Sequence, residues 1–430
     1  MTNKAGNQVV DARGWVAWGV ASSCLLFQFV VQIQPSAMIK PLEVSLQVDA
    51  VELGWLSAAY FLSYLILQVP MGWLLDRFGP RLVLGTSMVL GSIGLIWFGT
   101  ASTLDSAIAA RAGLGVAGAP AFAASALVAS REFPASRFAL MLGLTEAFTL
   151  LGGVAVTLGL PVLDRVVSRG GSGVVLAVIS AVLALACFLL VKGRTGPRTP
   201  ALAPAGHGDG GAPRSVARTI FNPVVLLAGV HAGLFFSIIA AFGGLWAAPF
   251  LRMRLGLEAA DASQPVAILF AAGVLGAPLL GLVSGRARWR GPTLLIASFM
   301  CAGSAALLIH APGGAWFVVS FLALLGFFAG VFAVDLAAVQ DVIEPRRRGL
   351  ALGTANMMLG VIGGPVVLML VAESLDRTGT SGSVEVLEAS IDQLRVALSW
   401  FIGGLVLAIP VGIALLVALR RQVLSRESIR

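Results

Sequence analysis

The stretch GGSGVVLAVISAVLALACFLLV, residues 170–191, contains no Asp, Glu, Lys or Arg. A helix needs about 20 consecutive apolar residues to cross the hydrocarbon core of a bilayer, and this stretch is long enough. In lipid, backbone polar groups must be satisfied within the segment itself, which a helix achieves in a single run. The stretch therefore predicts a membrane-spanning helix.

Eleven further runs of similar composition predict eleven more spans. They cover 14–39, 53–75, 82–104, 106–130, 138–163, 219–251, 262–285, 292–310, 314–340, 349–372 and 396–419. Over the whole chain, 58% of the residues are hydrophobic and 12% are charged, against about 25% charged in a soluble domain. We therefore expect an all-α membrane protein with twelve transmembrane helices.

The basic residues are distributed unequally between the predicted loops. Of the 29 Lys and Arg, 21 fall on the side that carries both termini and 7 on the other side. The positive-inside rule then places both termini in the cytoplasm, and we expect a multi-pass protein of a bacterial-type inner (plasma) membrane. The same distribution accounts for the net charge of +8, so nucleic acid is not an expected partner.

A Gly- and Pro-rich linker at 193–219 divides the chain into two parts, 1–192 and 220–430, of six predicted helices each. An offset of 211 sets Pro and Gly at equivalent points of the two parts. It pairs Gly115 with Gly326, Pro134 with Pro345, Arg137 with Arg348, and Gly152-Gly153 with Gly363-Gly364. Two parallel six-helix repeats place a substrate cavity at their interface, near the middle of the bilayer.

The segment GWLLDRFGPR, at 72–81, resembles the loop signature of the major facilitator superfamily, G-x-L-x-D-R-x-G-R-[KR]. The matching residues are Gly72, Leu74, Asp76, Arg77 and Gly79, and Pro80 stands where a basic residue is usual, with Arg81 following. A second copy at 281–290 keeps the first Gly but has Gly285 in place of the Asp. The segment RAGLG, at 111–115, is similar to the superfamily's R-x-x-x-G element.

The resemblance covers the whole chain and implies the major facilitator fold, in which two pseudo-symmetric six-helix bundles pack together. It also implies that the 72–81 loop latches the two bundles on the cytoplasmic side. The expected gate residues are Gly72, Asp76, Arg77, Gly79 and Arg81. The alternative is a positively charged loop that carries a solvated Asp.

Charged residues inside predicted spans are expensive and mark a pathway or a pairing. Arg111 offers a planar, charged fork that suits a carboxylate or phosphate, so it is the first candidate to bind substrate. The alternatives are a structural pair or a side chain that extends to the outer interface. Glu146 is the first candidate to carry a proton, because burial disfavours the charged form of a carboxylate. Its alternative is a hydrogen bond to a neighbouring helix.

Two more residues in predicted spans can titrate. Asp335 is a second candidate for proton coupling, and its alternative is an ion pair with Arg286 or Arg288. His231 either titrates or is a buried, hydrogen-bonded neutral side chain.

Polar residues also form stripes at helical spacing. Gln28 and Gln32 are one turn apart, and Tyr60, Tyr64 and Gln68 follow at i, i+4 and i+8. Such stripes should face protein or water rather than lipid. The resemblance implies that the first, fourth, seventh and tenth helices line the cavity. The expected substrate-binding residues are Gln28, Gln32, Arg111, His231, Phe235 and Trp246, with Tyr64 and Asn356 as weaker choices; the alternative for each is contact between helices.

We interpret the chain as a secondary transporter of a small organic anion that works by alternating access and is open to proton coupling. A proton-driven drug or metabolite exporter is the alternative, although the fifth helix, GLTEAFTLLGG, lacks the Gly-Pro motif usual in such exporters. Transport of a metal ion or metal chelate is a third class. No P-loop or Ser/His/Asp spacing indicates an enzyme, and no cofactor is implied. The expected partners are the solute, the lipid bilayer and protons, and the expected state is a monomer.

Overall fold

The computed structural model describes residues 11–37, 42, 46, 50–134, 137–167, 169–193, 213–257, 264–285, 287–344, 347–377 and 390–427. Every regular element in these residues is a helix. Twelve helical stretches in this part of the chain are long and apolar enough to span a membrane, which confirms the predicted count. The chain is therefore a multi-pass, all-α membrane protein.

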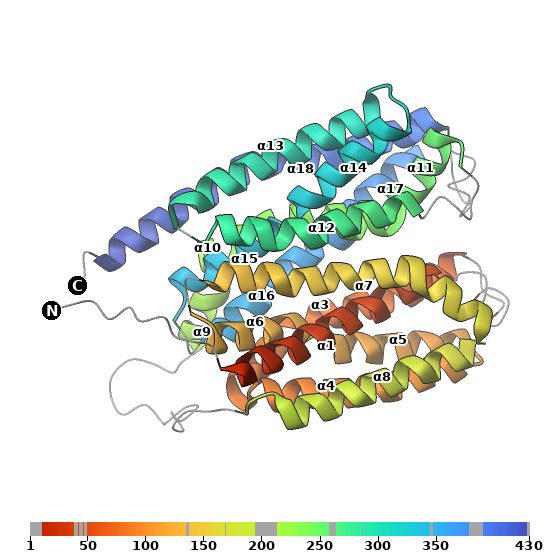
Figure 1. The fold of residues 1–430 in the computed structure, drawn as a ribbon. Coiled ribbons are helices and arrows are strands. Elements are labelled where there is room, and N and C mark those ends of the chain that lie inside the picture. Colours follow the sequence, from red (N-terminus) through yellow and green to blue (C-terminus); the bar gives the residue numbers. More distant parts are fainter. Residues whose placement is uncertain are drawn as a thin grey trace.

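The helices of residues 12–190 lie together in one half of the molecule (Figure 1). They are α1 (Ala12–Ala37), α3 (Ala50–Phe78), α4 (Pro80–Thr100), α5 (Leu104–Gly118), α6 (Ala121–Glu132), α7 (Phe138–Val166) and α8 (Arg169–Leu190). We call them the first helix group. α5 and α6 form a single span, so the group holds six spans.

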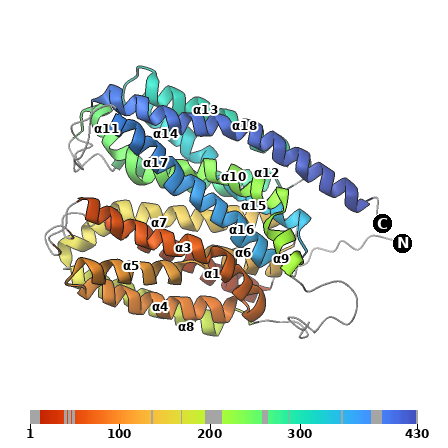
Figure 2. The same cartoon turned by 180° about the vertical axis from the view of Figure 1, so that it is seen from behind.

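The helices of residues 223–427 form the second helix group, which lies beside the first (Figures 1 and 2). They are α10 (Pro223–Ser237), η2 (Ile238–Trp246), α11 (Ala247–Leu255), α12 (Gln264–Val283), α13 (Ala287–His310), α14 (Ala315–Ala329), α15 (Phe332–Val342), α16 (Arg348–Val361), η4 (Ile362–Val366), α17 (Val367–Arg377) and α18 (Ile391–Glu427). α1 begins and α18 ends at the same end of the molecule, which we call the termini end.

The predicted linker at 193–219 is not entirely irregular. Residues 213–220 form a short helix, α9 (Pro213–Ile220), which belongs neither to the first nor to the second helix group. Residues 194–212, which hold the rest of the predicted linker, lie outside the described residues. α10 then begins at Pro223 with Asn222 as its cap, because the Asn222 side chain accepts a hydrogen bond from the Val224 N–H at 2.9 Å.

Four spans are interrupted where the sequence predicts continuous helices. The fourth breaks between α5 and α6, where Pro120 lacks the N–H that would continue the ladder, and the tenth breaks at Gly330. The seventh and eleventh contain the π-helical segments η2 and η4, the latter with Pro365 inside it. π-Helical turns are rare and often mark functional positions, so these spans are the ones most suited to local movement.

Glycines bring the two helix groups into close contact along two helix pairs. α3 packs on α16 where Gly72 meets the backbone of Gly349, and α7 packs on α12 where Gly143 meets the backbone of Ala277. A Cβ at Gly72 would lie 2.6 Å from the Gly349 carbonyl oxygen, so only glycine fits there. Close backbone approach at small residues is the usual way that membrane helices pack.

The outward faces of the bundle are apolar. Leu189 and Met369 are 69% and 71% exposed. In water such apolar faces would promote aggregation, but in a bilayer they contact lipid tails. Many polar side chains of the spans are buried, among them Gln28, Glu146 and Asn356, and these position the candidate site between the two groups.

Candidate functional site

A small cavity lies between the two helix groups. It has a volume of about 30 Å³, which is room for about two water molecules. Six polar side chains line it: Gln28, Gln32, Tyr64, Glu146, Thr149 and Asn356. Each is at least nine-tenths buried, so the structure shows the cavity in a nearly closed conformation.

The α1 side of the cavity is a pair of amides held in place by a tyrosine. The Gln28 Nε2 donates to the Gln32 Oε1 at 2.9 Å and to the Tyr60 hydroxyl at 2.8 Å. Gln28 and Gln32 are one helical turn apart, so both reach the cavity from the same face of α1. The polar stripe on α1 faces protein and the cavity, as the sequence predicts, and leaves each amide further groups with which to bind a solute.

The second polar wall joins the two helix groups. The Asn356 Nδ2 of α16 donates to the Tyr64 hydroxyl at 3.2 Å and to the Gln68 Oε1 at 3.0 Å, both on α3. The Gln68 Nε2 is buried and has no hydrogen-bond partner. A solute that hydrogen-bonds Tyr64 or Asn356 therefore competes with a contact that holds the groups together.

Among the described residues that line the cavity, Glu146 is the only one with a carboxyl group. It lies in the first half of α7 and is 4% exposed. Thr149, three residues later and hence on the same helix face, interacts with its carboxyl group. The Thr149 hydroxyl has no partner of ordinary hydrogen-bond geometry, which leaves it available to a bound solute.

Aromatic rings complete the wall, and the sequence analysis does not identify them. They are Phe29, Phe61, Phe122, Phe236 and Phe332. A signal exists for Phe29, which lies three residues before Gln32 and is therefore its neighbour on the surface of α1. Phe236 and Phe332 have no comparable signal, because the sequence does not show how α10 and α15 are rotated toward the cavity.

Arg111 does not line the cavity, contrary to the prediction. It is fully buried, and its guanidinium donates to three backbone carbonyls, those of Val31 at 2.8 Å, Gln32 at 3.0 Å and Leu56 at 3.3 Å. Val31 precedes Pro35 by four residues, and Pro35 has no N–H to donate to it, so α1 leaves that carbonyl free. The structure thus gives Arg111 a packing role between α1, α3 and α5.

Two aromatic rings stabilise the Arg111 charge further. The guanidinium carbon lies 4.6 Å from the centre of the Tyr60 ring and 5.7 Å from that of Phe98. Both distances are within the range of cation–π attraction. The site therefore compensates a buried cation without a carboxylate.

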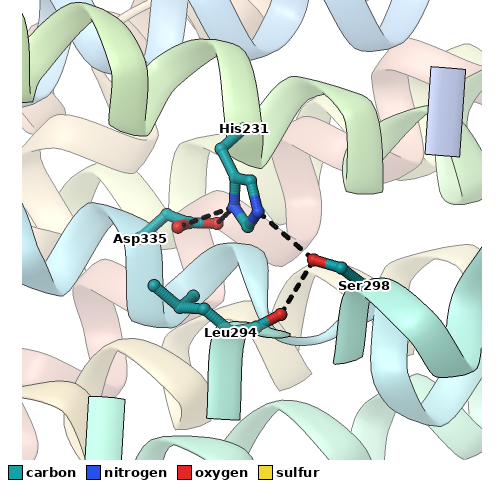
Figure 3. A network of polar contacts seen from close by, with 4 residues as sticks. All are labelled: His231, Leu294, Ser298 and Asp335. Atoms are coloured by element: carbon teal, nitrogen blue, oxygen red, sulfur yellow. Dashed lines mark hydrogen bonds and ion pairs between the residues drawn. The ribbon is translucent and has the colours of Figure 1, made fainter. Parts of the chain in front are cut away.

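His231 and Asp335 contact each other within the second helix group (Figure 3). The His231 Nδ1 lies 2.9 Å from both carboxylate oxygens of Asp335, and both side chains are fully buried. Neither residue lines the cavity. His231 therefore does not face the cavity in this conformation, and Asp335 pairs with His231. The side chains of Arg286 and Arg288, its predicted partners, lie outside the described residues.

Phe235 and Trp246 also lie outside the cavity wall. The Phe235 ring packs on the His231 ring with 5.0 Å between the centres, and Phe236, one residue later, lines the cavity instead. Trp246 ends η2 and is buried, and its Nε1 has no hydrogen-bond partner.

At the termini end, Asp76 of α3 caps the first turn of α16. Its carboxylate oxygens accept from the N–H groups of Gly349 at 3.2 Å and Leu350 at 3.1 Å. These N–H groups belong to the first turn of a helix, where no intrahelical partner exists and where the helix dipole favours negative charge. Asp76 therefore links the first helix group to the second.

Residues 20–367 match the family described as the Major Facilitator Superfamily. The chain belongs to the major facilitator superfamily. Its members move solutes across membranes, so the chain is a membrane transporter.

Relatives and a solved structure agree with this assignment. The chain is 26% identical over 360 residues to a probable galactarate/D-glucarate transporter of Pseudomonas putida, covering 74% of this chain and 76% of that one. It is 24% identical to a probable sulfoacetate transporter of Cupriavidus necator, covering 83% and 86%. A crystal structure of the E. coli fucose:proton symporter has the same fold, with a TM-score of 0.63 at 15% identity, covering 91% of this chain and 97% of that one.

The structure also shows how Arg77, Gly79 and Arg81 of the 72–81 signature lie. Gly79 has φ 82°, a left-handed value that favours glycine, and it precedes α4. Arg77 is exposed and lies over the rings of Trp73 and Phe78, at 5.3 and 5.4 Å, while Arg81 is exposed near Gly193. In this conformation, Gly72 and Asp76 of the signature contact the second helix group.

Proposed function

We propose that this transporter moves a small, hydroxylated organic anion together with protons by alternating access. The observation that carries the proposal is the composition of the central cavity. Its wall offers amides and hydroxyls, which both donate and accept hydrogen bonds, around the single carboxyl group of Glu146. Polyhydroxylated acids present the matching groups, and the relatives named for galactarate, D-glucarate and sulfoacetate support an anion.

Glu146 supports proton coupling through electrostatics. No Lys or Arg is among the residues that line the cavity. An anion beside an ionised carboxylate in a site of low dielectric would be repelled strongly. A proton on Glu146 removes this repulsion, so binding of the anion and of the proton should favour each other.

The size of the cavity supports a change of conformation. A volume of about 30 Å³ cannot hold a sugar acid, so the two helix groups must separate before one enters. We propose that residues 1–192 and 220–430 move as two bodies joined by the 193–219 segment. The excess of basic residues supports a cytoplasmic location for the termini end, where Asp76 then closes the cytoplasmic side.

Uptake into proteoliposomes tests the proposal. The full chain would be given radiolabelled galactarate, D-glucarate or sulfoacetate, with neutral galactitol as the control solute. A gradient of about one pH unit should accumulate at least one anion by about tenfold for each proton moved. Failure of every anion to enter, or uptake that ignores the gradient, would refute the proposal.

Glu146→Gln tests the role of the cavity carboxyl group. The amide mimics the protonated acid, so exchange of the anion across the membrane should persist while accumulation driven by a gradient of about one pH unit falls by about tenfold, the share of one proton. Glu373→Gln is the matched control, because Glu373 forms an exposed pair with Arg377 far from the cavity wall. Undiminished gradient-driven accumulation in Glu146→Gln would contradict the assignment of Glu146 as proton carrier.

A further inference from the structure

The His231–Asp335 pair has no role in the cavity, yet it places two titratable side chains in the middle of the second helix group (Figure 3). α10 contributes the imidazole, α15 the carboxylate and α13 the Ser298 hydroxyl, and all three side chains are fully buried. Burying two ionisable side chains in a membrane protein costs free energy, and such residues usually serve a function beyond helix packing.

The charge of the pair depends on one proton. With imidazolium and carboxylate the pair has no net charge, whereas neutral imidazole with carboxylate leaves a single negative charge in a fully buried place. An uncompensated buried charge is strongly destabilising. In the closed conformation the pair should therefore hold the extra proton.

The hydrogen bonds around His231 fit the doubly protonated ring. Nδ1 lies 2.9 Å from each Asp335 oxygen, so Nδ1–H donates to the carboxylate. Nε2 lies 3.4 Å from the Ser298 Oγ, and that hydroxyl donates to the Leu294 carbonyl at 2.8 Å. Because the serine proton is already engaged, its oxygen is left to accept from Nε2–H.

Ser298 also suits the unprotonated ring. When Nε2 gives its proton to a water molecule that reaches it, the hydroxyl can rotate and donate to Nε2 instead. The Leu294 carbonyl remains satisfied, since it precedes Ser298 by one helical turn within α13 and accepts the backbone N–H of that helix. Both protonation states thus have hydrogen-bond partners, as a reversible proton site requires.

The surroundings of the pair contain no competing charge in the described part of the chain. α18 contributes Gly412, where a Cβ would lie 2.8 Å from the His231 Nε2, and α10 itself contributes the Phe235 ring. Cys301, one turn beyond Ser298, is engaged with the Leu325 carbonyl at 3.9 Å. Among the described residues, His231 is the ionisable side chain that contacts Asp335.

The pair is mechanically linked to the cavity through two phenylalanines. Phe332 lies one turn before Asp335 on α15, and Phe236 follows His231 on α10. Their rings contact each other edge to face, with 5.8 Å between the centres, and both line the cavity. A movement of α10 against α15 would alter the cavity wall and the pair together.

We infer that His231, Asp335 and Ser298 form a proton-binding site in the second helix group, distinct from Glu146, whose proton is released only when α10 and α15 move apart. This inference rests on the proposed proton-driven transport. It adds a second proton to the cycle and assigns it to side chains that do not touch the solute.

Nuclear magnetic resonance of ¹⁵N-histidine in nanodiscs tests the site without any substrate. The chain has three histidines, so His207→Gln with His310→Gln leaves only His231. Near neutral pH both ring nitrogens should carry protons, and Asp335→Asn should convert the ring to a singly protonated form. A ring that is neutral whenever the protein is folded would overturn the inference. If Asp335→Asn does not fold, Ser298→Ala serves instead, and it should change the Nε2 signal but not the Nδ1 signal; an unchanged Nε2 signal would count against the site.

Transport of D-glucarate in proteoliposomes separates this inference from the proposed function. Asp335→Asn should lower accumulation driven by about one pH unit by about tenfold, the share of one proton, and leave exchange within about twofold. Asp341→Asn is the control on the same helix, because Asp341 pairs with Arg290 at the termini end. If the wild type accumulates D-glucarate and Asp335→Asn accumulates it equally well, the second proton site is overturned, but the proposed function is not. Absence of gradient-driven accumulation in the wild type refutes the proposed function, and the ¹⁵N spectra then decide the site.

Discussion

At the scale of single residues, burial of a charge in a membrane helix has two different outcomes in this transporter. Arg111 is surrounded by acceptors, three backbone carbonyls and two aromatic faces, so its charge is compensated and held in one place. Glu146 faces the cavity, where Thr149 interacts with its carboxyl group and no Lys or Arg is among the described residues of the wall, so its charge is not compensated. The first arrangement stabilises the fold, and the second is suited to taking up a proton.

Arg111→Lys should therefore lower stability without changing which solutes are transported. An ammonium group reaches one carbonyl at a time, and leaving the other buried acceptors unsatisfied costs about 1–3 kcal/mol. We expect a lower melting temperature in detergent and an unchanged preference for anions over galactitol. Arg377→Lys is the control, since its exposed pair with Glu373 should contribute about 0–1 kcal/mol. Selective loss of anion transport at unchanged stability would instead make Arg111 a substrate ligand.

At the scale of secondary-structure elements, the N-terminus of α16 is the point where the two helix groups are held together at the termini end. Asp76 supplies the negative charge that the end of this helix favours. The carboxylate can reach it because Gly72 and Gly349 let the backbones of α3 and α16 touch. Gly72 and Asp76 of the signature thus act together: the glycine allows the close approach that brings the aspartate to the end of α16.

Asp76→Asn should open the termini end. An amide loses the charge and one of the two acceptor oxygens, and interactions of charge with a helix terminus are worth about 0.3–2 kcal/mol. Leu350→Cys, in a chain without the three native cysteines, provides the reporter, because Leu350 is 5% exposed at this contact. A water-soluble maleimide should label it faster in Asp76→Asn, and equal labelling rates would count against the capping role.

Gly72→Ala should open the same end for a steric reason. The new Cβ would lie 2.6 Å from the Gly349 carbonyl oxygen and 3.0 Å from its carbon, which the backbones can relieve only by separating. Gly303→Ala is the matched control in another helix, where a Cβ meets nothing within 4 Å. Faster labelling of Leu350→Cys is expected for Gly72→Ala only; the same rate in both variants would argue against tight packing at this contact.

At the scale of the whole molecule, the two connections between the helix groups are chemically different. The pair α3 and α16 has the Asp76 cap, whereas α7 and α12 meet through Gly281 on the Ala139 carbonyl, with Gly285 at the position equivalent to Asp76. The two halves resemble each other weakly in sequence, but the contacts at the two equivalent positions do not have the same interaction energy. We expect the α3–α16 side to respond more strongly to conditions that weaken electrostatic interactions.

A disulfide between the groups tests whether transport needs them to separate. In a cysteine-free background, Leu65→Cys with Gly360→Cys would join α3 to α16, since the Leu65 Cγ lies 3.9 Å from a Cβ at position 360. Oxidation should stop transport and reduction should restore it. The control is Gly91→Cys with Ser180→Cys, where a Cβ at position 91 lies 3.1 Å from the Ser180 Oγ within the first group. Transport that continues through the oxidised Leu65/Gly360 pair would contradict movement of the groups as two bodies.

What the amino-acid sequence decides for this transporter is the class of fold and the number of spans. Both follow from a local condition, because each apolar run of about 20 residues must satisfy its own backbone in lipid. The same logic identifies Arg111, Glu146, His231 and Asp335 as the unusual charges, since any ionisable group inside a span stands out. Gln28, Gln32 and Tyr64 follow from helical spacing, and Asn356 follows from the resemblance to the superfamily.

Only the tertiary structure assigns these residues to their partners. Arg111 finds carbonyls because Pro35 frees one of them 76 positions earlier in the chain, and His231 meets Asp335 from 104 residues away. η2 and the breaks in the fourth and tenth spans interrupt helices that the sequence predicts as continuous, and the packing of α10 brings Phe236 rather than Phe235 to the cavity. Local spacing carries no information about how helices far apart in sequence are rotated against one another, and that rotation decides which buried charge is compensated and which is left to bind a proton.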